Sequence, residues 1–454
     1  METNLKDRRK KIIAKIRYII TLSILLVVLY FAYKYYQENN FNDFVRSETN
    51  VYTSSFKRDS EVKYSDKRSY KIESNMANDA MFYKNIKVEK NQSYKISCMV
   101  KTNNVVAENK NSGIGAQISV EGTTERSIAI SGTQDWQKIE MIINSKDREN
   151  INIGFRLGGY LGKATGEVWF SDFKIEEGVL EKDNNWNFAC FIFQNTDVEI
   201  EEKKVNINVT QNEINDIALT LNRFEKTANE LSGGKINIKS DIHKIDIPLS
   251  KLSYSNQFGY YIAPEDVEEQ IGDIINTNNY DHIFVIVKLG NEKYIDDIEI
   301  NDWIGLGSMD YYGIGFSNIR LPNDSKNYIY KYNTRINQFP EEVFLHEFLH
   351  SLERTANEYG YSRPELHDYQ KYGYKEEALI GQKKWYEAYM KKTIQDEGKY
   401  IGLPEEVYTL KPAKKSDFKN SYEMKEAFKQ PENIIEELKE LIDNLVKKIK
   451  YLVE

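Results

Sequence analysis

The sequence predicts a multidomain protein with an N-terminal transmembrane helix, an all-β sandwich, and an α/β domain that ends in a C-terminal helix. An apolar run follows a cluster of Lys and Arg near the start of the chain. Short alternating strands come next, and strands then alternate with helical patterns. The length of 454 residues is enough for about three domains. We place the segments at residues 1–40, 41–180, 181–430 and 431–454.

The first segment has the features of a signal anchor. Its apolar run extends from Tyr18 to Tyr33, and the basic residues before it are Lys6, Arg8, Arg9, Lys10, Lys11, Lys15 and Arg17. The positive-inside rule then places the N-terminus in the cytoplasm and the folded domains outside the cell. No A-x-A pattern follows, so we expect an uncleaved single-pass anchor in the cell membrane.

Composition excludes some classes of partner and of site. The net charge of -8 gives no reason to expect nucleic acid as a partner. Two cysteines are too few for a disulfide scaffold or a Cys-rich zinc site. Both Cys98 and Cys190 lie in apolar strands, so we expect two buried free thiols.

The second segment predicts an antiparallel β-sandwich, because its strands alternate apolar and polar residues between polar turns. Examples are "YKISCMVKT", "GTQDWQKIEMIIN", "INIGFRLGG" and "GEVWFSDFKIEEG". These stretches resemble the jelly-roll carbohydrate-binding modules of bacterial extracellular enzymes. The resemblance implies that a polysaccharide or glycoprotein glycan binds there.

In such modules a glycan stacks on exposed aromatic rings. The candidates here are Tyr83, Tyr160 and Trp169, and the alternative is that Trp136 and Trp169 are core residues. The resemblance also implies a structural Ca²⁺ near the final strand, to which Asp172 would contribute.

The third segment predicts a mixed α/β layer arrangement. Helical patterns ("TQNEINDIALTLNRFEKTANELSGG", "APEDVEEQIGDII") alternate with strands ("KINIKSDIHKIDI", "DHIFVIVKL", "GIGFSNIRL"). His243 and His282 lie in strands, where we expect structural roles. The chain ends in "PENIIEELKELIDNLVKKIKYLVE", which predicts an amphipathic helix docked on this domain, with a coiled-coil seam as the alternative.

The stretch "FPEEVFLHEFLHSLERTANEYG" contains the spacing H-E-x-x-H. Pro340 and Gly360 fit the start and the stop of one helix. His346 and His350 then lie one turn apart on the same face, where both imidazoles can bind one Zn²⁺ ion. Glu347, beside the first of them, can take a proton from a water that the metal polarises.

A third ligand must come from the chain after it reverses at Gly360. Glu358 is about 12 Å along the helix from His350, which is too far. A returning segment reaches His367, and imidazole suits zinc. Three of the five histidines fall in this stretch, so we favour His367. The alternatives are Asp368, Glu376 and Glu377.

The third segment resembles the zincin class of zinc metalloproteases, in its H-E-x-x-H helix and in the order of helices and strands before it. Glu353 and Ala356 replace the Gly and His of the metzincin subclass, and we expect Glu353 to support the ligands instead. The resemblance implies that "GIGFSNIRL" is the edge strand that pairs with a protein or peptide substrate. It also implies a tyrosine that stabilises the oxyanion, for which we choose Tyr372 over Tyr374.

The sequence therefore predicts a membrane-anchored extracellular zinc metalloendopeptidase, directed by a glycan-binding-like module. Glu347 would be the general base, and His346, His350 and His367 the zinc ligands. One alternative is a surface glycan-binding protein whose protease-like domain is inactive. Another is a zinc amidohydrolase that acts on cell-wall peptides.

Overall fold

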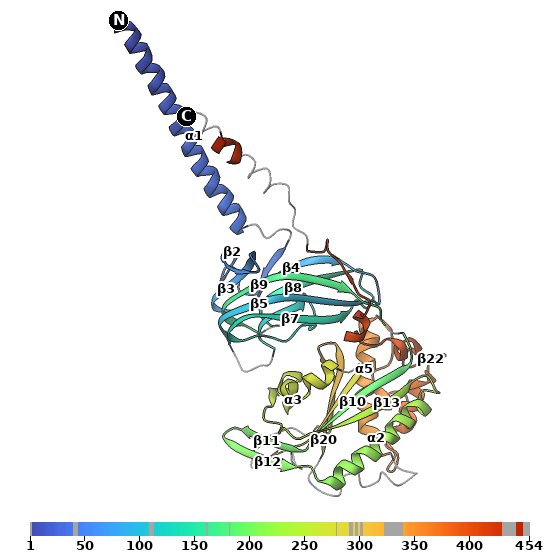
Figure 1. The fold of residues 1–454 in the computed structure, drawn as a ribbon. Helices are drawn as coiled ribbons and strands as arrows, with labels where there is room; N and C mark the ends of the chain where they lie inside the picture. The colour runs from blue at the N-terminus through green and yellow to red at the C-terminus, as the bar shows by residue number, and fades with distance from the viewer. Residues whose placement is uncertain are drawn as a thin grey trace.

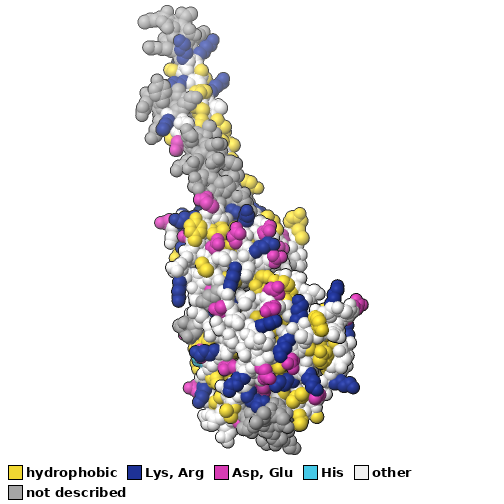
Figure 2. Space-filling view, turned by 90° about the vertical axis from the view of Figure 1, so that its right-hand side faces the viewer, with side chains coloured by type: hydrophobic (Ala, Val, Ile, Leu, Met, Phe, Trp, Pro, Cys, Tyr) yellow, Lys and Arg dark blue, Asp and Glu magenta, His cyan; other side chains and the backbone are white. Residues whose placement is uncertain are grey.

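The computed structural model has three parts, which Figure 1 shows as a projecting helix, a β-sandwich and an α/β domain at the far end. It describes residues 2–39, 44–108, 113–159, 162–180, 182–277, 279–289, 294–295, 298–299, 303–321, 339–428 and 442–447. Lys and Arg side chains are interspersed with Asp and Glu on the face that Figure 2 shows.

Helix α1 (Glu2–Asn39) projects from the sandwich. Its 25-residue stretch Arg9–Tyr33 is long and apolar enough to cross a membrane, and it is almost entirely exposed. It is the one helix with this property among the described residues, and a signal sequence near the N-terminus would be equally long and apolar. Its length and composition fit a membrane anchor or a signal sequence.

The sandwich consists of two antiparallel sheets, as the alternating pattern predicts. One sheet contains β1 (Val45–Glu48), β4 (Ala80–Lys87), β8 (Asn150–Gly158) and β6 (Gly115–Val120), in that order. The other contains β2 (Ser54–Tyr64), β3 (Lys67–Asn78), β9 (Ala164–Glu177), β5 (Ser93–Ala107) and β7 (Gly132–Asn144). Phe82, Phe155 and Phe170 meet in the fully buried core between them.

The candidate glycan residues have different fates in the structure. Trp169 is only 6% exposed and donates from its indole N–H to Asp59 at 2.9 Å, so it is no exposed platform. Tyr83 is half-buried, and Tyr160 lies outside the described residues. Trp136 is half-buried beside Tyr64 and is not a core residue.

Asp172 faces two cations of the protein itself. Its carboxylate lies 3.0 Å from the ammonium of Lys67 and 3.3 Å from that of Lys174. These partners hold the pKa of Asp172 below its usual value, although burial opposes the shift. The positive surroundings do not support Ca²⁺ binding by this side chain.

The α/β domain has a five-stranded mixed sheet. Its order is β13 (Asn237–Ile245), β10 (Asn185–Phe193), β16 (His282–Lys288), β20 (Ile314–Leu321) and β19 (Gly305–Tyr311), and β19 alone among them runs antiparallel. Alternate residues of β10 enter two cores. One core contains α2 (Gln211–Leu231), α5 (Glu342–Glu358) and α6 (Lys383–Met390). The other contains α3 (Pro264–Thr277) and the hairpin of β11 (Asn195–Ile200) and β12 (Lys203–Asn208).

Short elements connect these layers. The hairpins are β14 (Ser253–Ser255) with β15 (Gly259–Tyr261), β17 (Tyr294–Ile295) with β18 (Ile298–Glu299), and β21 (Ile394–Asp396) with β22 (Lys399–Ile401). The 3₁₀ turns are η1 (Asp368–Gln370), η2 (Glu405–Thr409) and η3 (Lys415–Phe418). Both cysteines are buried free thiols, as expected. His243 and His282 pack on Phe191 and Phe188, in agreement with structural roles.

The predicted edge strand is wrong. "GIGFSNIRL" forms β20, which lies inside the sheet between β16 and β19. Its residues Phe316–Leu321 are buried, and it pairs with β16 on one side and with β19 on the other. Among the described residues, β19 is the outer strand on this side of the sheet, and β13 is the outer strand on the other.

The predicted boundary at residue 430 also needs correction, because the chain returns to the sandwich before it. Strand β23 (Tyr422–Glu423) pairs with β9, and the Phe428 ring stacks on Phe44 and contacts Phe155. Buried Asp417 accepts a hydrogen bond of 2.6 Å from the hydroxyl of Ser93.

Most of the predicted C-terminal helix 431–454 lies outside the described residues. Residues 442–447 are helical, and Figure 1 places them on the α1 side of the sandwich. This part of the helix is therefore not docked on the α/β domain, contrary to our expectation.

The Asp417→Ala variant is expected to lower the free energy of unfolding by about 1–3 kcal/mol, because the Ser93 hydroxyl would lose its buried acceptor. Thermal unfolding measures the change. Asp396→Ala, on the exposed end of β21, is the control and should change the value by less than about 0.5 kcal/mol. An Asp417→Ala variant as stable as the wild type would show that this contact does not stabilise the sandwich.

Candidate metal centre

Helix α5 carries the H-E-x-x-H spacing, and its opposite face fixes it in the domain core. The buried side chains of that face include Phe344, Leu345, Phe348, Leu349 and Leu352. Phe348 contacts the rings of Trp186 and Phe188 in β10, so the helix is locked against the middle of the sheet. His346 and His350 consequently point away from the core, one turn apart, and both are half-buried.

Three imidazoles converge at this point. The Nε2 atoms of His346 and His350 lie 3.1 Å apart, and those of His350 and His367 lie 3.2 Å apart. All three ligand nitrogens fall within 4.8 Å of one another, and no other such group of His, Cys, Asp or Glu occurs in the described ranges. Zn–N bonds of about 2.0–2.1 Å at tetrahedral angles separate two nitrogens by about 3.3 Å. The arrangement therefore fits a zinc ion.

Two hydrogen bonds orient the helix histidines. His350 Nδ1 lies 2.8 Å from Glu353 Oε2, and His346 Nδ1 lies 2.9 Å from the Tyr386 hydroxyl. A carboxylate can only accept, so the His350 proton sits on Nδ1 and leaves the Nε2 lone pair for a metal. Burial, with His350 and His367 nearby, lowers the pKa of His346 to about 3, which keeps this ring neutral.

Glu353 joins the helix to the segment that follows it. Its Oε1 accepts the Leu366 N–H at 2.8 Å and the Tyr389 hydroxyl at 3.1 Å, and it pairs with Arg363 at 2.8 Å. Both charged side chains of that pair are almost fully buried, at 7% and 3% exposure. The residue after Leu366 is His367, so this network sets where the third imidazole lies.

The other candidates for the third ligand lie elsewhere. Asp368 follows His367 but is directed to Lys371, at 3.4 Å. Glu376 and Glu377 line the cleft beside the histidines and do not belong to their cluster. Tyr372 stacks on Trp385 and lines a separate pocket, where its described contacts do not include the three histidines.

Glu347 lies in the wall of a cleft of about 930 Å³ that adjoins His346. It is 5% exposed, and the backbone N–H of Gly307 in β19 donates to its carboxylate. Burial raises the pKa of Glu347 to about 7. A Cβ atom at Gly305 or Gly307 would collide with Glu347, so glycine at these two positions lets the edge strand approach.

Neither this role of β19 nor the role of Tyr386 was among the predictions from the sequence. Gly305 and Gly307 are two residues apart, which places them on one face of a strand. This spacing could have indicated a strand that packs closely against another element. Tyr386 is one of 32 tyrosines and comes from α6, long after the motif. No local pattern marks it.

Comparisons with known proteins give no family. Neither the protein-family models nor the curated proteins contain a match. Similar solved structures cover about a third of the chain, which corresponds in length to the sandwich. The enzymatically active domain of tailspike protein 4 of bacteriophage CBA120 is 11% identical with a TM-score of 0.25, over 31% of this chain and 20% of that chain.

Carbohydrate-binding modules are also among the similar structures. CBM4 is 16% identical with a TM-score of 0.21, over 31% of this chain and 90% of that chain. The CBM22-1 xylan-binding domain from Paenibacillus barcinonensis is 15% identical with a TM-score of 0.20, over 29% of this chain and 83% of that chain. At these values, the sandwich fold of this protein is assigned from its own strand pairing.

The Glu353→Ala variant should lower zinc affinity by roughly 10- to 100-fold, because His350 loses its orienting acceptor and the His367 segment loses its anchor. Competition with a chromogenic chelator measures the affinity. Glu365→Ala is the matched control, since Glu365 also lies near Arg363, at 3.3 Å, but is 67% exposed. Equal affinities of the two variants would contradict the anchoring role.

The His367→Ala and Asp368→Ala variants separate the two neighbouring candidates. Zinc at one hundred times its Kd should stabilise the wild type and Asp368→Ala by about 2.7 kcal/mol. His367→Ala, with two histidines left, should lose most of this gain at the same zinc concentration. Thermal unfolding with and without zinc provides the measurement, and the reverse pattern would identify Asp368 as the ligand.

Proposed function

We propose that this protein is a membrane-anchored extracellular zinc metallopeptidase. The observation that carries the proposal is the convergence of the His346, His350 and His367 nitrogens beside the buried carboxylate of Glu347, at the wall of an open cleft. Zinc sites with three protein ligands keep a further position for water or substrate, as catalytic sites require. Three imidazoles whose Nε2 atoms converge are a suitable donor set for this metal.

A zinc ion held by these histidines would supply Lewis acidity, which polarises a carbonyl group and acidifies a water molecule. Glu347 takes the proton of the attacking water and passes it to the leaving amine. Glu353 and Tyr386 keep the two helix imidazoles in their ligating orientation, through the contacts at 2.8 and 2.9 Å.

The substrate would bind in extended form along β19. This strand ends the sheet in the described part of the chain, so one of its edges can pair with a further strand. Gly305 and Gly307 place that edge against Glu347, and Gly305 also lines the cleft. A peptide paired with β19 therefore passes beside the general base, which favours a peptide over a compact small molecule.

The remaining parts would fix the enzyme at its place of action. Helix α1 would anchor it in the cell membrane, with the basic N-terminus in the cytoplasm. The sandwich would contact a polysaccharide or a glycoprotein glycan. The partly exposed pair of Tyr64 and Trp136, whose ring centroids are 5.6 Å apart, is the aromatic surface that favours this role. The same pair is what favours the alternative of a glycan-binding protein with an inert second domain.

Replacement of the general base tests the proposal. Glu347→Gln should keep zinc at wild-type stoichiometry but lower the cleavage of a labelled unfolded protein by about 10²- to 10⁴-fold. The exposed Glu406→Gln is the control and should cleave normally. Unchanged proteolysis in Glu347→Gln would overturn the assignment.

Two further outcomes would favour the alternatives. A purified extracellular part that binds no zinc would favour the inert glycan-binding protein. Hydrolysis of cell-wall peptides, without hydrolysis of proteins, would favour the amidohydrolase.

A further inference from the structure

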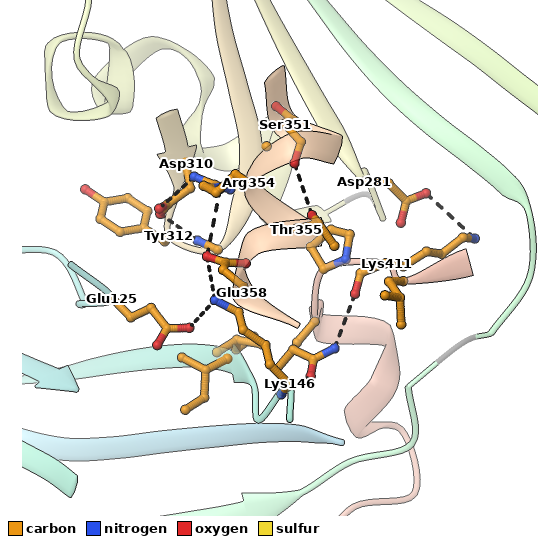
Figure 3. A pocket seen from close by; sticks show the side chains of 18 of the residues that line it. Glu125, Lys146, Asp281, Asp310, Tyr312, Ser351, Arg354, Thr355, Glu358 and Lys411 are labelled. Carbon is orange, nitrogen blue, oxygen red and sulfur yellow. Dashed lines mark hydrogen bonds and ion pairs between the residues drawn. The ribbon is translucent and has the colours of Figure 1, made fainter. Parts of the chain in front are cut away.

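The sandwich contacts the C-terminal end of α5, the helix that carries His346 and His350. Lys146, in the turn between β7 and β8, lies 2.8 Å from Glu358 Oε1 (Figure 3). Asn91, in the turn between β4 and β5, accepts a hydrogen bond of 2.6 Å from the Tyr359 hydroxyl. The last helical residue and the residue after it are thus both held by the other domain.

Asn91 and Lys146, which we call the platform, lie in two turns of the sandwich that hydrogen bonds hold together. The Asn91 N–H donates to the Lys146 carbonyl at 2.6 Å. Both residues have positive φ, at 49° and 56°, a conformation that residues with side chains seldom adopt. The Asn144 amide donates to Asn91 Oδ1 at 3.1 Å, and Glu125 pairs with the Lys146 ammonium at 3.0 Å. These bonds direct both side chains of the platform at α5.

The interface between the domains combines apolar side chains with ion pairs, among them the pair of Lys146 and Glu358. A cavity of about 90 Å³ lies there, lined by residues of both domains, including Glu125, Lys146, Arg354 and Glu358 (Figure 3). Lys146 and Glu125 are only 17% and 14% exposed, so solvent screens their interaction less than that of surface pairs. Arg126 and Glu265 form a second ion pair across the interface.

The contact point is also where the chain begins its return to the metal site. Helix α5 ends at Glu358, and the chain reverses at Gly360, which has a φ of 71°. The returning residues Arg363 and Leu366 bind Glu353, and His367 follows. A shift of the reversal would therefore move the third imidazole, and a zinc site tolerates only about ±0.2 Å in its ligand distances.

We propose that the sandwich is a positioning domain for the metal centre, in addition to any binding of its own. Its platform fixes the end of α5, and with it the segment that delivers His367 to the other two histidines. The proposal rests on the zinc site of the proposed function. It implies that Lys146, in a different domain from the ligands, determines how well they bind zinc.

The test compares Lys146→Met, Lys146→Arg and the control Lys138→Met in the full chain. Lys138 lies in β7 of the same domain and pairs with Glu140 at 2.8 Å, but its side chain is 56% exposed. Zinc affinity is measured by chelator competition, and the ligand geometry by the visible absorption of the Co²⁺-substituted protein. Lys146→Met should lower zinc affinity roughly tenfold and change the cobalt spectrum. Lys146→Arg should restore much of both, and Lys138→Met should match the wild type.

Tyr359→Phe provides a second variant, which removes the hydroxyl contacts to Asn91 and Asn144 and keeps the ring. It should shift zinc affinity in the same direction by a smaller factor. Wild-type affinity and cobalt spectrum in both Lys146→Met and Tyr359→Phe would overturn the positioning role.

These readouts do not depend on catalysis. If the wild type has no peptidase activity, the proposed function is contradicted. If Lys146→Met still binds zinc more weakly than that wild type, the positioning role of the platform is supported. Where cleavage is observed, Lys146→Met should lower kcat more than it changes KM, and equal kcat values would count against the platform.

Discussion

One buried carboxylate, that of Glu353, determines the geometry of the candidate metal centre. A buried charge must be matched by hydrogen bonds and by an opposite charge, or it destabilises the fold. Glu353 meets this requirement with partners from separate parts of the chain: a ligand imidazole, the backbone of the returning segment, Arg363 and the Tyr389 hydroxyl. Because all of these partners bind the same carboxylate, each of them helps to fix the position of the others. The tautomer of His350 and the place of His367 thus have one physical origin.

The parts of this site that sequence could predict are those that depend on local geometry. Helical periodicity alone places His346 and His350 on one face, and the reach of a returning chain makes His367 a sound choice. The spacing of apolar and polar residues likewise predicted the antiparallel sandwich and the alternating strands and helices of the α/β domain, and both are present. These inferences needed only the period of a helix or strand and the length of a segment.

The errors concern which elements become neighbours. The resemblance to zincins implied that β20 is a substrate-binding edge, yet the strand β19 pairs outside it. Trp169 had two interpretations, a glycan platform or a core residue, and its burial beside the Asp59 carboxylate of another strand agrees with the second. The Tyr386 contact to His346 joins residues in different helices. Such pairings follow from the packing of the whole chain. The spacing of apolar residues within one segment does not indicate them.

The return of the chain to the sandwich has a consequence for biosynthesis. The aromatic cluster around Phe44 and Phe155 receives its last ring, Phe428, only after the entire α/β domain has been made. A chain emerging from the ribosome can therefore pair most of the sandwich strands early but cannot complete that cluster. The α/β domain is therefore synthesised in full before Phe428 can close this cluster. Premature termination before Phe428 would thus leave the aromatic cluster of the sandwich incomplete.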